Sequence, residues 1–336
     1  GEDTQEMLFS SVSNPIAGLF IGILGTVLVQ SSSASTSIIV GLVGTGALGV
    51  ADAVPMVMGA NIGTTVTNTL VALAHIRQSD EFKRAFAAAT VHDFFNLLSV
   101  CVLLPVELST GFLSTLAEKI SGQLVGSSGS EWKSPIKKWV KEPVGWLQDF
   151  GGAIGAEGNV LGTFLVVVGL FIILGALAYI TKNMRRLVAD RIEASLNKVL
   201  GTGAGLVAMI LGLLITISVQ SSSITTSIMI PLAAAGVVTL RNIYPVTLGA
   251  NVGTTITALL AALAASRPEA LTVAIVHSLF NLGGIFLLYP IPSVREIPIR
   301  AAEKLAKLAV ERRLLAIAYV VIAFIIVPLL GVAILR

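Results

Sequence analysis

A long internal repeat of polar residues restricts what this chain can fold into more than any other feature. The segment QSSSASTSIIV starts at Gln30 and matches QSSSITTSIMI, which starts at Gln220. The motif GAN-x-GTT follows each segment at the same offset. Residues 30–70 align with residues 220–260 without a gap, and 18 of the 41 positions are identical. The chain therefore contains two copies of one structural unit.

A third block extends the repeat after a deletion of five residues. The segment VHDFFNL from Val91 matches VHSLFNL from Val276. A purely structural duplication would share its apolar pattern, whereas the residues shared here are mostly polar. Two membrane repeats of this kind are typical of secondary transporters.

The composition indicates a membrane protein. Hydrophobic residues make up 54% of the 336 residues and charged residues only 12%, about half the share of a soluble domain. The segments Leu161–Ile180 and Leu314–Leu335 carry no charge and match the roughly 20 residues needed to cross a bilayer. We expect an all-α polytopic membrane protein. The net charge of +3 comes from basic loops and does not support nucleic-acid binding.

Each copy is predicted to contain a re-entrant helical hairpin and a broken transmembrane helix. The apolar stretches Pro15–Val29 and Thr202–Val219 run into QSSS, and a second apolar stretch follows each of them. Limbs of about 15 residues are too short to cross, so QSSS is expected at a hairpin tip inside the membrane. The next helix should open at Pro55 or Pro245, and the glycines of GAN-x-GTT favour a local break.

The hairpin adds no net crossing, so a complete copy crosses three times and the second copy is inverted. The span Val160–Ile180 precedes the second hairpin, and its counterpart in the first copy would lie before residue 1. With this topology the basic runs Arg77–Arg84, Lys182–Lys198 and Arg295–Arg313 fall on the cytoplasmic side, as the positive-inside rule requires. Lys119–Lys141 then becomes a loosely structured outer linker.

Four units follow from this topology. Residues 1–110 form the first repeat without its first span, and residues 111–157 an extracytoplasmic linker. Residues 158–294 form the second repeat. Residues 295–336 form an amphipathic segment on the inner surface, followed by the last span.

The two QSSS motifs are candidates for binding an anion. Polar side chains in mid-membrane cost free energy unless they are satisfied. The second limb of each hairpin starts at the serines, so its unpaired N–H groups and partial positive charge favour an anion. Phosphate has enough oxygens to satisfy both tips at once; alternatively, the serines only cap ordinary helices. The candidate ligands are Gln30, Ser31, Ser32, Ser33, Gln220, Ser221, Ser222 and Ser223.

Neutral oxygens near the tips suit a small alkali cation. Asp93 is the one acid inside a polar motif of the repeats, and it aligns with Ser278. A carboxylate in a low-dielectric site favours a bound cation or proton. Alternatively, Asp93 is simply protonated, and the threonines join helices. The candidate sodium ligands are Asn61, Thr64, Thr65, Asp93, Asn96, Asn251, Thr254, Thr255, Thr257 and Asn281.

These motifs together resemble the type II sodium-dependent phosphate cotransporters. The resemblance rests on the paired QSSS and GAN-x-GTT blocks and on RAFAAATVHDFFNLLSV, and it covers most of the chain outside the linker. It implies symport of sodium with inorganic phosphate by alternating access, with the two QSSS tips forming the substrate site.

Details of the resemblance bear on particular residues. In that family the pattern of Ala87, Ala89 and Asp93 goes with electrogenic transport, the acid serving one sodium site. Vertebrate members have other residues where this chain has His75, Gln78 and Ala250, so no ligand is carried over to those three positions. The linker has no cysteine, which fits a bacterial member.

The expected function is sodium-coupled phosphate symport in the cell inner (plasma) membrane, by a multi-pass protein with sodium as co-substrate and no other cofactor. One alternative is symport of another oxyanion, such as sulfate or a small carboxylate. Another is an intramembrane serine enzyme with His92 or His277 as its base. Serines duplicated in inverted copies speak against an enzyme. The expected partners are inorganic phosphate, sodium and the lipid bilayer.

Overall fold

The fold was analysed in a computed structural model. It describes residues 14–126, 145–153, 155, 158, 160–165, 167–169, 171–172, 205–265 and 267–335. All regular structure in these residues is helical. Four stretches among them are long and apolar enough to cross a membrane: α6 (Ser79–Thr110), α12 (Leu240–Ala264), α13 (Glu269–Leu288) and the continuous run Arg313–Leu335.

Some predicted segments lie outside the described residues. The basic run Lys182–Lys198 lies there entirely, and the span Val160–Ile180 is described only as far as residue 172. Residues 127–144 of the linker are also outside. The part of the linker that is described starts with helix α7 (Phe112–Gly126), so the prediction of a loosely structured segment was wrong for residues 119–126.

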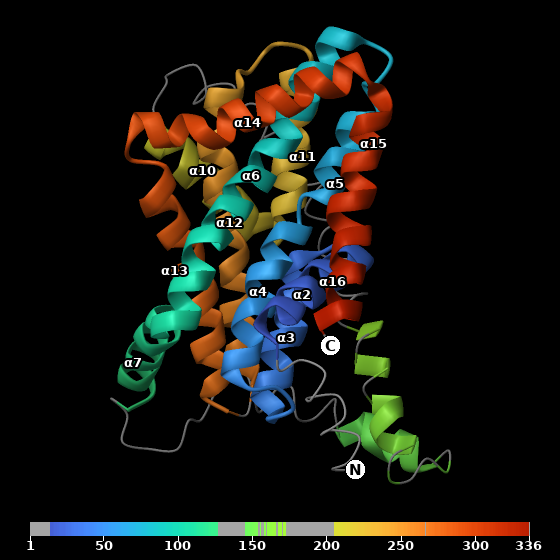
Figure 1. Ribbon diagram of the computed structural model, residues 1–336. Coiled ribbons are helices and arrows are strands. Elements are labelled where there is room, and N and C mark those ends of the chain that lie inside the picture. Colours follow the sequence, from blue (N-terminus) through green and yellow to red (C-terminus); the bar gives the residue numbers. More distant parts are fainter. Residues whose placement is uncertain are drawn as a thin grey trace.

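Two helix pairs carry the QSSS motifs at their turns, as predicted. The first pair is α2 (Pro15–Val29) and α3 (Ser32–Thr45); the second is α10 (Gly205–Val219) and α11 (Ser222–Ala234). Gln30 and Gln220 make the turns with left-handed backbones, φ 56° and 57°. Figure 1 shows α2 and α3 in the lower half of the molecule and α10 and α11 in the upper half.

The two GAN-x-GTT helices differ from each other. In the first copy α4 (Val50–Gly63) ends, Thr64 and Thr65 form a turn, and α5 (Val66–Leu73) follows. In the second copy α12 runs through the motif without interruption. The predicted broken helix is therefore correct for the first repeat and wrong for the second. Pro55 and Pro245 lie inside these helices, so their predicted role as the opening residues was also wrong.

The motif glycines have a packing role that explains why they need not break a helix. A methyl group at Gly59 would overlap the carbonyl oxygen of Leu19, and one at Gly249 would overlap that of Met209. Glycine at such positions lets two helix backbones approach closely. The glycines therefore allow α4 to pack closely on α2 and α12 to pack closely on α10.

Helices from the two copies interleave in one bundle. Helix α13 contacts α3, α4 and α6, and α11 contacts α5 and α6. The predicted amphipathic segment is confirmed as α14 (Pro292–Glu311), which crosses one end of the bundle (Figure 1). The last span follows as α15 (Arg313–Val321), the π-helix η1 (Ile322–Ile326) and α16 (Val327–Leu335).

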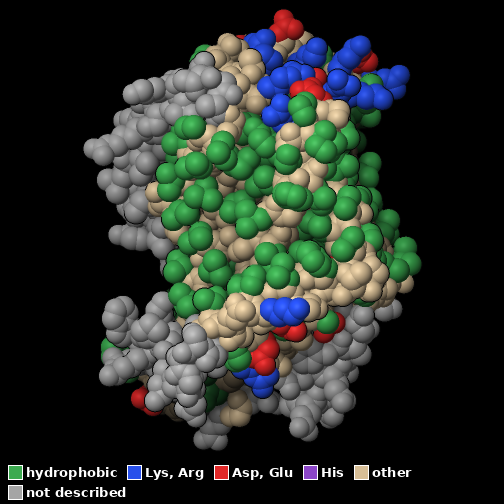
Figure 2. All heavy atoms as spheres, turned by 90° about the vertical axis from the view of Figure 1, so that its left-hand side faces the viewer, with side chains coloured by type: hydrophobic (Ala, Val, Ile, Leu, Met, Phe, Trp, Pro, Cys, Tyr) green, Lys and Arg blue, Asp and Glu red, His purple; other side chains and the backbone are tan. Residues whose placement is uncertain are grey.

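The surface is divided as expected for a protein in a bilayer. Figure 2 shows a belt of hydrophobic side chains with Lys and Arg gathered at the end that carries α14. The run Arg77–Arg84 spans the start of α6, and the run Arg295–Arg313 includes most of α14. Two of the three predicted basic runs therefore lie at one end, and the third is outside the described residues.

Candidate functional site

Each hairpin tip is capped by the first serine of its motif. The Ser31 Oγ accepts a hydrogen bond from the Ala34 N–H at 3.2 Å, and the Ser221 Oγ accepts one from Ile224 at 3.4 Å. The N–H groups of the next two residues in each limb have no acceptor within the helix. The capping alternative is thus correct for Ser31 and Ser221, and each limb still presents free donors.

The motif glutamines close the turns and attach them to the GTT segments. Gln30 donates to the Val27 carbonyl at 2.5 Å, and its amide oxygen accepts from the Thr67 hydroxyl at 3.0 Å. Gln220 donates to Ile217 at 2.7 Å and accepts from Thr257 at 2.8 Å. Each amide thus makes one donated and one accepted bond that hold its tip in place, and one N–H of each amide remains available.

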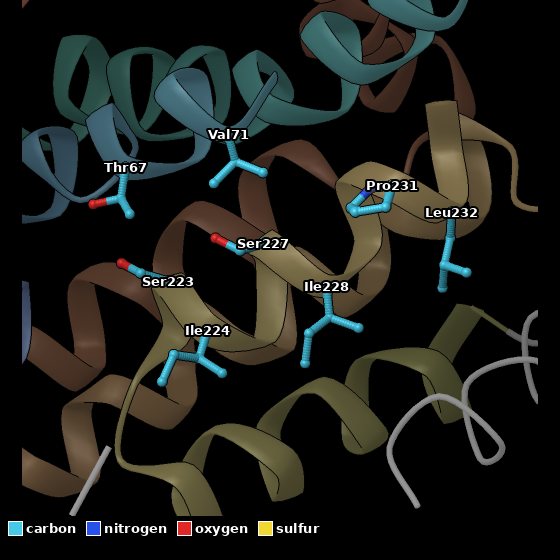
Figure 3. A pocket seen from close by; sticks show the side chains of 8 residues that line it. All are labelled: Thr67, Val71, Ser223, Ile224, Ser227, Ile228, Pro231 and Leu232. Carbon is cyan, nitrogen blue, oxygen red and sulfur yellow. The ribbon is translucent and has the colours of Figure 1, made fainter. Parts of the chain in front are cut away.

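A cavity of about 410 Å³ lies between α5 and α11. Thr67, Ser223 and Ser227 bring hydroxyl groups to it, and its remaining wall is apolar. Figure 3 shows Ser223 and Ser227 facing Thr67 and Val71 across the cavity. Because Thr67 also bonds Gln30, the first tip borders the cavity that the second tip lines.

The other motif serines do not line this cavity. Ser32, Ser33 and Ser222 are buried, and Ser31 and Ser221 are partly buried. The Ser222 hydroxyl has no hydrogen-bond partner although its atom is fully buried. The structure thus brings the two tips towards a common element, α5, without placing all six serines in one pocket.

Asn68 joins α5 to α11 and was missed by the sequence analysis. Its amide nitrogen donates to the Thr226 hydroxyl at 2.8 Å, and its oxygen accepts from Ser227 at 3.0 Å. Asn68 aligns with Ala258 in the second copy, so the repeat does not single it out. The only sequence feature that points to Asn68 is its amide side chain, next to residues that the two copies share.

Four predicted sodium ligands form one buried amide cluster at the centre. Asn96 donates to the Asn61 carbonyl at 2.8 Å, and Asn281 donates to the Asn251 carbonyl at 3.1 Å. The Asn251 amide donates to the side-chain oxygens of Asn96 at 2.9 Å and Asn281 at 3.0 Å. His277 meets the Asn61 side chain at 3.3 Å. These bonds tie the two copies together.

The predicted threonine ligands bond the backbone of their own helices or a glutamine. The hydroxyls of Thr64, Thr65, Thr254 and Thr255 donate to carbonyls three or four residues earlier. A donating hydroxyl keeps a lone pair for a cation. Thr64 and Thr65 lie at the α4–α5 turn, whereas Thr254 and Thr255 lie inside α12.

Asp93 has one engaged and one free oxygen. It is 4% exposed on α6, and its Oδ2 accepts from the Tyr319 hydroxyl at 2.7 Å. Its Oδ1 is buried without a hydrogen-bond partner. The carboxylate borders an apolar cavity of about 650 Å³ between α2, α6 and the last span. A free, buried carboxylate oxygen is suited to a cation.

Tyr319 was also missed, because it lies outside the repeats. It is the single hydrogen-bonding side chain in Leu314–Leu335, which is the signal that could have found it. Its ring packs edge-on against Phe324 of η1, with centroids 5.8 Å apart. A π-helical turn is often found at functional sites, and here it directly follows the helix that carries the partner of Asp93.

The described residues contain no group of three or more His, Cys, Asp or Glu that could hold a metal ion. In the same residues neither His92 nor His277 hydrogen-bonds a serine of the QSSS motifs. The polar groups at the tips and the turn are therefore neutral donors and acceptors, with Asp93 as the one acid among the predicted ligands.

Comparison with known proteins gives one consistent result. The chain is 37% identical to sodium-dependent phosphate transport protein 2A of Rattus norvegicus over 94% of its length, and 34% identical to protein 2B of Homo sapiens over 95%. The aligned regions cover 60% and 59% of those relatives, so the chain spans about three fifths of their length. No solved structure matches.

The family-level comparison agrees with these relatives. The profile of the Na+/Pi-cotransporter family matches residues 1–114 and 171–293. These ranges contain both hairpins and both GAN-x-GTT helices, while Tyr319 and α14 from residue 294 onward lie outside them. The chain is a multi-pass membrane protein and belongs to the Na+/Pi-cotransporter family.

Proposed function

We propose that the protein carries inorganic phosphate across the inner (plasma) membrane together with sodium, by alternating access, and that it is not an enzyme. The observation that carries this proposal is the meeting of both QSSS tips on α5. Thr67 bonds Gln30 of the first tip and faces Ser223 of the second. The named function of the relatives supports the same choice of substrates.

Phosphate would bind between the two tips. Free N–H groups at the start of α3 and α11 and the hydroxyls of Ser31–Ser33 and Ser221–Ser223 would donate to its oxygens. The helix dipoles would favour its negative charge. Gln30 and Gln220 would hold the tips through their bonds to Val27 and Ile217 and orient the anion with the second N–H of each amide.

Sodium would bind near the free Oδ1 of Asp93. The Thr65 side chain lies within interaction distance of the Asp93 carboxylate, so hydroxyls and carbonyls of the Thr64–Thr65 turn would complete this site. Thr254, Thr255 and Thr257 would serve the second copy. Asn61, Asn96, Asn251 and Asn281 would act as ligands through lone pairs left by their mutual bonds. A sodium ion carried at Asp93 in addition to those that balance the charge of the phosphate would make transport electrogenic. Sodium would then strengthen phosphate binding and phosphate would strengthen sodium binding.

The topology proposed for this cycle is two inverted repeats with re-entrant hairpins. The placement of α2–α3 and α10–α11 in opposite halves of the molecule supports it (Figure 1). The unit boundaries proposed above (residues 1–110, 111–157, 158–294 and 295–336) go with it. In this topology the end that carries α14 faces the cytoplasm, because its loops are basic.

Transport assays test the proposal. Purified protein in liposomes should accumulate labelled phosphate when a sodium gradient is imposed, with a matching inward current. Uptake of equal size under a potassium gradient would contradict coupling to sodium. Excess unlabelled sulfate or a small carboxylate should leave phosphate uptake unchanged. Full competition by either would assign the site to a different oxyanion.

A further inference from the structure

A third cavity, lined by basic residues, lies at the opposite end of α11 from the second QSSS tip, at the end of the bundle that carries α14. It has a volume of about 720 Å³ and lies between the start of α6, the loop that joins α11 to α12, and α14. Six cationic side chains and two acidic ones line it: Lys83, Arg84, Arg241, Arg300, Lys304 and Lys307, with Asp80 and Glu303.

The acids do not neutralise this cavity. Arg241 pairs with Glu296 at 2.7 Å and with Glu303 at 3.3 Å, so Glu303 already has a partner. Hydrogen bonds from Arg241 lower the pKa of Glu296, which keeps that pair ionised. The Arg84 guanidinium donates to the carbonyls of Ala233 and Ala234 at 3.1 and 2.9 Å and keeps its own charge. Asp80 is the one lining acid left.

Three lysines face the cavity without a counter-ion. Lys83, Lys304 and Lys307 form no ion pair within the described part of the chain. Lys304 and Lys307 lie on α14 at a spacing of three, so they point to one side of the helix. Lys83 comes from α6, which packs against α14. Converging cations from two helices favour an anion with several charged oxygens.

The cavity lies at the level where lipid headgroups are expected. Helix α14 buries Pro298, Ile299, Ala302, Ala306 and Ala309 against the bundle and carries its charges on the other side. Figure 2 shows the basic end directly above the hydrophobic belt. Amphipathic helices of this kind lie at the bilayer surface, and basic pockets there bind phosphate-bearing headgroups.

We propose that this cavity binds the headgroup of an anionic phospholipid, through its phosphate. The lipid bridges Lys83 on α6 with Lys304 and Lys307 on α14, next to the α11 end that Arg84 caps. Its acyl chains lie along the hydrophobic belt. The bound lipid connects α14 to the C-terminal end of α11 in the second hairpin.

The test uses the full chain in a neutral detergent, with dioleoyl phosphatidylglycerol as the probe and native mass spectrometry as the readout. The wild type should retain phosphatidylglycerol and not dioleoyl phosphatidylcholine. The triple variant K83Q/K304Q/K307Q should bind phosphatidylglycerol at least about tenfold more weakly, since each cation near an anionic lipid contributes several-fold.

A matched variant separates the site from general surface charge. R77Q/R312Q/R313Q removes three exposed cations at the same end but outside the cavity, and it should retain the lipid as the wild type does. Equal loss in both triple variants would overturn the proposal. So would displacement of the lipid by millimolar inorganic phosphate, which would assign the cavity to the free anion. Unchanged binding in K83Q/K304Q/K307Q would overturn it as well.

Discussion

The two copies of the repeat share their scaffold contacts almost bond for bond. Gln30 bonds Thr67 as Gln220 bonds Thr257, and Asn96 bonds the Asn61 carbonyl as Asn281 bonds that of Asn251. Ser31 and Ser221 cap their helices in the same way. These shared contacts shape the hairpin tips and the centre of the molecule.

The copies differ around Asp93. The first copy has the acid and the Thr64–Thr65 turn, whereas the second has Ser278 and an uninterrupted α12. Thr26 and Ser35 are buried without partners, while their counterparts Thr216 and Thr225 bond each other at 2.8 Å. Symmetry therefore accounts for the scaffold, and the departures from symmetry mark the candidate cation site. Five predictions test this division.

The largest effect is expected from the shared glycines. G59A and G249A place a methyl group on a carbonyl oxygen of the crossing helix, and overpacking against backbone costs about 1–3 kcal/mol or more. Both should sharply reduce the yield of folded protein and lower the melting temperature. G25A, on the same helix pair but with open space around it, should behave as the wild type. Tolerance of G59A alone would show that the two crossings are not equivalent.

Asp93 should matter more than its counterpart. The attraction between two unit charges 4 Å apart is about 4 kcal/mol at an effective dielectric of 20, and a third of that is tenfold in affinity. D93S, which copies the second half, should abolish the sodium-dependent current and weaken sodium binding about tenfold or more. S278A should change neither. D93N keeps the size and the Tyr319 acceptor, and a normal current in D93N would contradict the assignment.

Thr67 and Thr257 should have equal effects on the tips and unequal effects on phosphate. Valine in either place removes a hydrogen bond to a glutamine oxygen, which contributes about 0.5–1.5 kcal/mol, so T67V and T257V should both reduce uptake. Only T67V should also raise the phosphate concentration for half-maximal uptake, because Thr67 lines the cavity facing Ser223. Serine at each position restores the hydroxyl and serves as the control. Equal phosphate affinities in T67V and T257V would show that the cavity between α5 and α11 is not part of the phosphate site.

Substitution of Tyr319 should weaken sodium binding and leave phosphate binding unchanged. Y319F removes one hydroxyl and keeps the ring contact with Phe324. The Asp93 carboxylate then loses a fixed donor, and sodium affinity should fall roughly three- to tenfold, in line with the net contribution of about 0.5–1.5 kcal/mol from a typical hydrogen bond. Phosphate affinity at saturating sodium should stay constant. Y289F is the control, and the same sodium curve in both variants would exclude a positioning role.

The smallest predicted effect is an increase in the stability of the protein. S35T places the counterpart of Thr225 in the first copy, where the buried Thr26 hydroxyl has no hydrogen-bond partner. Serine already has the hydroxyl, and the methyl group of threonine restricts χ1 and should hold that hydroxyl in the orientation of Thr225. The resulting bond to Thr26 should stabilise the protein by about 1 kcal/mol, seen as a melting temperature a few degrees higher. T225S in the second half should lower it by a similar amount. A lower melting temperature for S35T would mean that the two unpaired hydroxyls serve another group.

Much of the fold follows from the sequence. Limb lengths and the QSSS turns locate both helix pairs, and the amphipathic pattern locates α14. Alignment of the copies could not reveal Tyr319 or Asn68, because Tyr319 lies outside the repeats and Asn68 aligns with Ala258. It also suggested a break in α12 that is absent, because glycine serves close packing and backbone bends equally well. The grouping of amides at the centre depends on helix crossing, which no local pattern encodes.

The backbone contacts at the shared glycines also limit how the protein can move. Gly59 and Gly249 bring two helix backbones into direct contact, so we expect α2 with α4, and α10 with α12, to move as stiff units. In the proposed cycle, access to the cavity between α5 and α11 would change by displacement of whole helix pairs. The Thr64–Thr65 turn is the flexible joint available to the first pair, while the second has none within α12. In the proposed alternating-access cycle, the half that holds Asp93 would supply a hinge and the second half would move without one.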